Sequence, residues 1–135
     1  MKNLLALIFI STIVLSCGKE DLVNTAQNQL VDITSVEQFN MEVKEGVSMV
    51  FYHASWCSKC AEQRPAVEMI SEKGEYNVVF FAEVEYEEHT DLVKAQKING
   101  FPTIVIYKDG VENKRFAGKG HEQSTLEVAL KAALN

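Results

Sequence analysis

Two cysteines separated by two residues, Cys57 and Cys60, are the residues of this 135-residue chain best suited to chemistry. They end the stretch ASWCSKC, which begins at Ala54. Pairs with this spacing occur in zinc sites, in structural disulfides and in redox-active pairs. The spacing alone does not distinguish these three chemistries, so the segments that position the pair have to decide between them.

The pair is expected at the junction between a strand and a helix. Residues 47–52 are mostly apolar and predict a strand, and a helix is expected over 57–73. Unpaired N–H groups and the helix dipole at such a junction favour an anion, so Cys57 would be the thiolate and the nucleophile. Cys60 lies one turn further on, on the same side of the helix as Val67, and is expected to be the more buried sulfur.

Strands and helices alternate along the rest of the domain. The expected strands, which are β-rich or continuously apolar, are Leu30–Ile33, Val47–Tyr52, Asn77–Val84, Thr103–Tyr107 and Glu112–Ala117. The expected helices run from Thr34 or Ser35 to about Lys44, from Cys57 to Lys73 before Gly74, from Thr90 (the expected cap) to Lys97, and from Ser124 to Leu134. Asp109-Gly110 predicts a hairpin between the last two strands. This order predicts an α/β domain with a central mixed sheet and helices on both faces.

The first sixteen residues have the pattern of a signal peptide. Lys2 supplies the positive charge, and residues 4–15 supply an apolar run that is shorter than the ~20 residues of a membrane-spanning helix. An uncleaved signal anchor is the alternative. Val14–Gly18 (VLSCG) resembles the lipobox of bacterial lipoproteins, which implies that Cys17 is lipidated and becomes the N-terminus. Residues 1–16 are therefore interpreted as a lipoprotein signal peptide, 17–29 as the lipidated cysteine with a flexible tether, and 30–135 as the domain.

The lipobox resemblance implies a location in the bacterial cell envelope, lipid-anchored on the periplasmic or cell-surface side. Lys19–Asp21 resembles a signal that sends some lipoproteins to the surface, although a solvated linker has the same composition. Lipidation of Cys17 would leave Cys57 and Cys60 as the remaining cysteines. The formal net charge of −6 argues against nucleic acid as a partner.

Four separated features resemble the thioredoxin superfamily over residues 30–135. They are the ASWCSKC stretch, Pro65 five residues after it, the stretch Gly100–Thr103 (GFPT), and Lys108-Asp109-Gly110 followed by Gly118. The resemblance implies a thioredoxin-like fold, a cis peptide bond before Pro102 and a redox-active Cys57–Cys60 disulfide, with no further cofactor and no metal. It also implies that Phe101, Pro102 and Thr103 pair with an extended substrate segment and that Trp56 offers an apolar contact surface.

The sequence departs from the family pattern at several positions. The family usually carries a buried aspartate where this chain has Phe51 and commonly has a lysine where it has Glu83. We expect Glu83 to take over proton handling for Cys60, and a solvated strand-end carboxylate is the alternative. Ser58 and Lys59 replace the usual Gly-Pro and are expected to raise the reduction potential, because positive charge stabilises the thiolate form.

His53 and the direction of electron flow remain open at this point. His53 is a strand-end residue, a modulator of the Cys57 thiolate or a third ligand for a metal held by both cysteines. The resemblance implies a thiol-disulfide oxidoreductase outside the cytoplasm that exchanges disulfides with protein substrates, as a tethered reductase served by a membrane electron donor or acceptor. Isomerase and oxidase versions are the close alternatives. A chaperone-like peptide-binding module and a metal-carrying module are the alternatives from another class.

Overall fold

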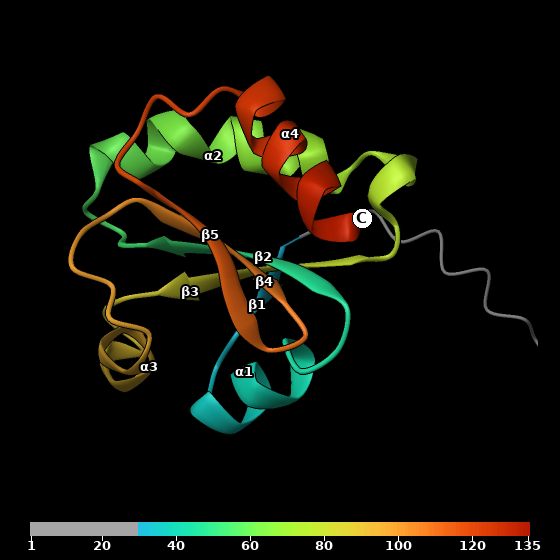
Figure 1. Ribbon diagram of the computed structural model, residues 1–135. Helices are drawn as coiled ribbons and strands as arrows, with labels where there is room; N and C mark the ends of the chain where they lie inside the picture. The colour runs from blue at the N-terminus through green and yellow to red at the C-terminus, as the bar shows by residue number, and fades with distance from the viewer. Residues whose placement is uncertain (1–29) are drawn as a thin grey trace, which may run out of the picture.

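The computed structural model of the chain describes residues 30–135, which are shown in colour in Figure 1. The interpretations of residues 1–16 as a signal peptide, of Cys17 as the lipidated residue and of 17–29 as a tether lie outside the described residues. Within the described part, the structure contains no helix that is long and apolar enough to cross a membrane.

Five strands form one mixed sheet in the order β1-β3-β2-β4-β5. The strands are β1 (Val31–Asp32), β2 (Val47–His53), β3 (Val79–Glu85), β4 (Thr103–Lys108) and β5 (Val111–Ala117). β3 runs parallel to β1 and to β2, whereas β4 is antiparallel to β2 and β5 is antiparallel to β4. The sheet is therefore parallel on one side and becomes antiparallel at β4, with β4 and β5 forming the hairpin that was predicted at Asp109-Gly110.

Helices cover both faces of the sheet, as the sequence predicts (Figure 1). α2 (Ser58–Ser71) and α4 (Gln123–Leu134) lie on one face, and α1 (Val36–Glu42) and α3 (Thr90–Ala95) lie on the other. β2 contributes apolar side chains to the core on both faces of the sheet, because alternate side chains of a strand point to opposite sides. Met49 and Phe51 join the core under α2 and α4, while Val50 and Tyr52 join the core under α1 and α3. All four side chains are fully buried.

The helix ends differ in detail from those expected. Ser35 caps α1, because its Oγ accepts the Gln38 N–H at 3.0 Å. α2 ends at Ser71 rather than Lys73, and the Ser71 hydroxyl donates to the Glu68 carbonyl, a side-chain bond that competes with the helical pattern. Thr90 is not the N-cap of α3. His89 is the N-cap, and its N–H donates to the Glu85 carbonyl in the preceding turn.

Candidate active site

Cys57 and Cys60 form a disulfide at the N-terminus of α2, with their Cα atoms 5.2 Å apart. A tight turn after β2 places them there, because the Cys57 N–H donates to the Ala54 carbonyl at 3.1 Å and α2 begins at the next residue. Cys57 is the N-cap, and its Sγ accepts the Cys60 N–H at 3.1 Å. Cys57 is 9% exposed and Cys60 is 3% exposed, so the expectation that Cys60 is the more buried cysteine is confirmed.

An aromatic strip, defined as Trp56, Phe101 and Tyr86, lies beside the disulfide. Phe101 packs against the core cluster that contains both cysteines. The Trp56 ring, 67% exposed, meets the Phe101 ring edge-on with centroids 6.2 Å apart. The Tyr86 ring contacts Phe101 from a second direction, with centroids 5.1 Å apart. The strip therefore offers an apolar surface that is continuous with the redox pair.

The loop before β4 contains the cis peptide bond between Phe101 and Pro102. Thr103 is buried and its hydroxyl donates to the Gly100 carbonyl at 2.8 Å, while the Pro102 carbonyl accepts the Gly118 N–H at 2.8 Å. A cavity of about 330 Å³ opens beside this loop. Its lining residues are Asn99, Gly100, Phe101, Thr103, Arg115, Ala117 and Gly118. Ser58 and Lys59 lie exposed on the first turn of α2.

Glu83 lies in register with Phe51 on the neighbouring strand, so both side chains face α2. The carboxylate oxygen Oε2 of Glu83 accepts from Arg64 at 2.6 Å and lies 2.9 Å from Nε2 of His53. Burial raises the pKa of Glu83, but the hydrogen bonds from His53 and Arg64 outweigh burial and hold the pKa below its ordinary value. With its side chain 21% exposed, Glu83 is a partly buried and paired carboxylate rather than a solvated one.

His53 is held by two carboxylates at the end of β2. Its Nε2 faces Glu83, and its Nδ1 lies 3.1 Å from Oε2 of Glu85. Each ring nitrogen of His53 therefore faces one carboxylate oxygen. The ring also stacks on Phe51, with centroids 5.3 Å apart, and the Arg64 guanidinium lies 5.3 Å from the centre of the Phe51 ring. His53 therefore belongs to a charged network that lies between the sheet and the helix carrying Cys60.

Two further carboxylates hold the residue at the start of the redox loop. The Ser55 N–H points at Oε1 of Glu85 at 2.8 Å and at Oε2 of Glu87 at 3.3 Å. The Ser55 hydroxyl donates to Oε1 of Glu87 at 2.9 Å. The sequence predictions missed Glu85, Glu87 and Arg64. Two signals could have found Glu85 and Arg64. Glu83 and Glu85 are two residues apart and so lie on one face of a strand, and Arg64 follows Cys60 by four residues on the same helix face.

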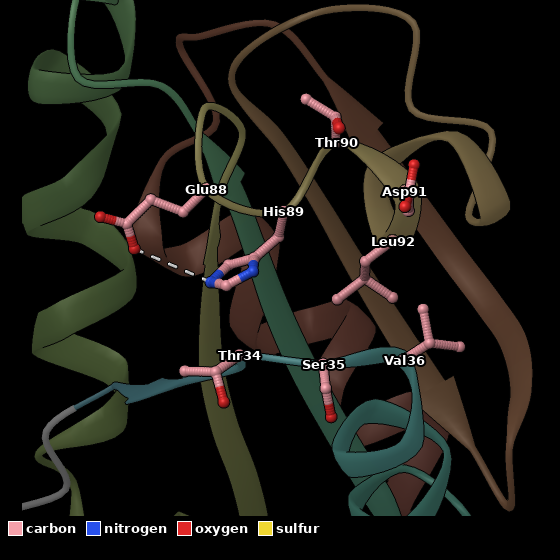
Figure 2. A pocket seen from close by; sticks show the side chains of 8 residues that line it. All are labelled: Thr34, Ser35, Val36, Glu88, His89, Thr90, Asp91 and Leu92. Carbon is pink, nitrogen blue, oxygen red and sulfur yellow. Dashed lines mark ion pairs between the residues drawn. The ribbon is translucent and has the colours of Figure 1, made fainter.

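A second cavity, of about 240 Å³, lies between the start of α1 and the start of α3. Figure 2 shows the imidazole of His89 directed towards the Glu88 carboxylate, with Nε2 and Oε2 3.8 Å apart. With Asp32, these residues are the one group of three metal-ligand side chains in residues 30–135 whose ligand atoms lie within 4.8 Å of one another. The described residues therefore do not assemble a three-ligand site from His53 and the two cysteines.

Known proteins with the same architecture are thioredoxins. The family model described as Thioredoxin matches residues 30–132. The chain is 32% identical to a thioredoxin of Mycoplasma genitalium over 91 residues, which cover 66% of this chain and 86% of the relative. It is 25% identical to a thioredoxin of Chlamydia caviae over 99 residues, or 73% of this chain and 95% of the relative.

Solved structures give the same result at the level of the fold. The thioredoxin of Malassezia sympodialis superimposes with a TM-score of 0.70 at 27% identity, covering 79% of this chain and 92% of that one. The thioredoxin of Trypanosoma brucei brucei superimposes with a TM-score of 0.70 at 25% identity, covering 80% and 93% respectively.

Proposed function

Because this chain belongs to the thioredoxin family and is a thiol-disulfide oxidoreductase with a Cys57–Cys60 disulfide, we propose that it works as a lipid-tethered reductase of protein disulfides outside the cytoplasm. The observation that carries the proposal is the position of the disulfide. It lies at the N-terminus of α2, next to an exposed aromatic strip and a loop with a cis proline. That arrangement lets a substrate cysteine reach Cys57 while Cys60 stays covered.

The reaction begins from the reduced pair. The Cys57 thiolate, which the helix N-terminus stabilises, attacks one sulfur of a substrate disulfide. A bond forms between that sulfur and Cys57, the substrate S–S bond breaks, and the departing substrate sulfur takes up a proton. Cys60 then loses its proton and attacks Cys57, so the Cys57–Cys60 disulfide forms and the second substrate cysteine leaves as a thiol. The substrate gains two electrons, which a membrane electron donor returns to the pair.

The second step needs an acceptor for the Cys60 proton. The position where the family usually has a buried aspartate is Phe51, which is fully buried and cannot accept a proton. Glu83 lies in register with Phe51, and both of the contacts that hold it use Oε2, which leaves Oε1 as the accepting atom. Glu83 is therefore assigned to proton handling for Cys60. Because its pKa lies below the ordinary 4.5, it is ionised across the neutral range.

Kinetics of Glu83→Gln from near pH 3.5 to pH 9 test this assignment. The wild type should lose its rate of Cys60 attack as the pH falls through the pKa of Glu83, which the hydrogen bonds from His53 and Arg64 hold below its ordinary value. The variant should be slower at neutral pH and should lack that acidic limb. Glu68→Gln, which removes another carboxylate beside Arg64, serves as the matched control. Identical profiles for Glu83→Gln and wild type would exclude the assignment.

Ser58 and Lys59 bear on the direction of the reaction. Both are exposed on the first turn of α2, where the Lys59 ammonium adds positive charge near the Cys57 thiolate. Because a stabilised thiolate makes the reduced form more stable, we expect a reduction potential somewhat above the ~−270 mV of thioredoxin. Titration against glutathione measures the potential, and Lys59→Gln should lower it. A potential as low as that of thioredoxin would contradict the charge argument.

An insulin-reduction assay tests the activity itself. The wild-type chain should reduce insulin with dithiothreitol as electron source, and Cys57→Ser should not. The absence of any Cys57-dependent turnover would instead favour a peptide-binding module. The tether is tested separately by cell fractionation, in which the wild type should remain with membranes and Cys17→Ala should not. Release of both forms into the soluble fraction would contradict lipid anchoring at Cys17.

A further inference from the structure

The acidic turn, defined as Glu85–Glu88, lies against the redox loop. Glu85 is the last residue of β3, and Glu85 and Glu87 both bond Ser55. Ser55 precedes Cys57 by two residues, so their Cα atoms are at most about 7 Å apart. A substrate whose cysteine is joined to Cys57 therefore places its neighbouring side chains within reach of the Glu85 and Glu87 carboxylates.

These two carboxylates are close together and lack a Lys or Arg partner among residues 30–135. Both converge on the single Ser55 N–H, and His53, the ring that faces Glu85, is shared with Glu83. Burial raises the pKa of Glu85, and its hydrogen bond with Glu87 raises it further. Two carboxylates that share a proton repel each other when both are ionised. An incoming cation would relieve that repulsion.

The aromatic strip leads directly to this pair of carboxylates. Tyr86 lies between Glu85 and Glu87 in the sequence, and its ring packs on Phe101, next to the cis proline. Trp56 extends the strip to the other side of Phe101 and is largely exposed. A bound segment would thus meet an apolar surface beside the disulfide and negative charge at the end of that surface.

We propose that the acidic turn makes this enzyme selective for substrates that carry a lysine or arginine one or two residues from the cysteine that Cys57 attacks. The inference rests on the proposed function and names the substrate class of the same site. An apolar part of the substrate segment covers the aromatic strip, and the basic side chain binds at the Glu85 and Glu87 carboxylates. Exposed ion pairs are worth up to about fivefold in an equilibrium, so a preference of that order is expected for one basic residue.

The test uses the full-length chain and a series of disulfide-linked peptide dimers with arginine, glutamine or glutamate beside the cysteine. Reduction is followed with dithiothreitol as electron source, and each rate is divided by the rate with dithiothreitol alone, which removes the intrinsic effect of peptide charge. The variant is Glu87→Gln. The matched control is Glu45→Gln, which makes the same charge change at an 87% exposed side chain before the start of β2.

The wild type and Glu45→Gln should favour the arginine peptide over the glutamate peptide by about fivefold in kcat/KM at low salt. The preference should shrink at 1 M salt, where charges are screened within about 3 Å. Glu87→Gln should lower the ratio of kcat/KM for the arginine peptide to kcat/KM for the glutamine peptide, and this ratio does not depend on any change in overall rate caused by the loss of the Ser55 contacts. Equal rates for all peptides, or a preference that survives Glu87→Gln, would overturn this inference alone. Failure to reduce any peptide would overturn the proposed function and this inference with it.

Discussion

Replacing Glu83 by glutamine removes one charge from the network beside the cysteines and keeps the shape of the side chain. In the wild type, Oε2 of Glu83 accepts from Arg64 at 2.6 Å and from His53 at 2.9 Å. The Glu83 side chain is 21% exposed, and those of Arg64 and His53 are 31% and 12% exposed. These contacts are therefore shielded from water far more than an ordinary surface ion pair.

The magnitude follows from the kind of bond that is lost. Hydrogen bonds to charged groups contribute about 1.5–3 kcal/mol and neutral ones about 0.5–1.5 kcal/mol, so removing the charge of the shared acceptor costs at most roughly 2–3 kcal/mol for the two bonds, because the Arg64 guanidinium stays charged. Glutamine avoids the cost of burying a carboxylate, which returns part of this energy. We therefore expect Glu83→Gln to lower the free energy of unfolding by about 1–2 kcal/mol at neutral pH. For a domain of about 100 residues this corresponds to a decrease in Tm of roughly 5–10 °C.

The pH dependence of this loss has a definite sign. The pKa of Glu83 is held below its ordinary 4.5 in the folded protein, so the carboxylate stabilises the fold above that pH. The stabilisation disappears as the pH falls through the lower pKa of the folded state. The difference in stability between wild type and Glu83→Gln should therefore be largest at neutral pH and should shrink as the pH falls through the folded-state pKa of Glu83.

Thermal unfolding of the oxidised protein at pH 7 and near pH 3 measures this difference, because the disulfide removes cysteine ionisation from both experiments. Glu68→Gln is the matched control, since Glu68 bonds the same Arg64 at 3.4 Å but is 46% exposed, and it should cost less than about 0.5 kcal/mol. Equal stability of Glu83→Gln and wild type at pH 7, or a deficit of the same size near pH 3, would refute the reasoning.

Three further changes test the framework that holds the site. Leu126→Ala should cost about 2–5 kcal/mol in urea unfolding, because Leu126 is a fully buried side chain of α4, whereas Leu126→Met should cost less than about 1.5 kcal/mol. Ser35→Ala should cost about 1 kcal/mol by removing the cap of α1, with Ser35→Asp nearly neutral in the same assay. Tyr52→Phe should cost about 1–3 kcal/mol, because the buried Tyr107 hydroxyl loses its 2.9 Å partner. The double variant Tyr52→Phe/Tyr107→Phe should cost less than the sum of the two single changes, and additive costs would contradict that account.

The order of elements could be predicted from the sequence because each prediction depends on neighbouring residues. Alternating and continuous apolar runs locate β2 and β3, and Asp109-Gly110 locates the hairpin, with Asp109 at a φ of 50° and Gly110 at 79°. The position of Cys57 at the start of α2 follows from the same local pattern. The cis bond at Pro102 is different, because it was predicted from the resemblance and not from local physics.

The charged network could not be predicted in this way because its members meet only through strand register. Glu83 is 19 residues from Arg64 in the sequence, and Ser55 is 32 residues from Glu87. The pairing of His53 with Glu85 and of Phe51 with Glu83 across β2 and β3 brings these side chains together. A shift of the register by one residue would turn all of them to the opposite face, so the network depends on a tertiary fact that no local pattern contains.

A carboxyl group at the Glu83 position of β3 differs in exposure and in pKa from one at the Phe51 position of β2. A carboxyl group in the place of Phe51 would be fully buried, and burial without a partner raises a carboxyl pKa. At Glu83 the acid is 21% exposed and is bonded to Arg64, so it stays ionised at neutral pH. The lowered pKa makes Glu83 a weaker base than a buried carboxylate would be. At neutral pH, however, Glu83 is ionised in nearly every molecule and is able to accept a proton. In the proton-handling role proposed for it, Glu83 would therefore be a weaker base than a buried aspartate but would be ionised at every pH in the neutral range.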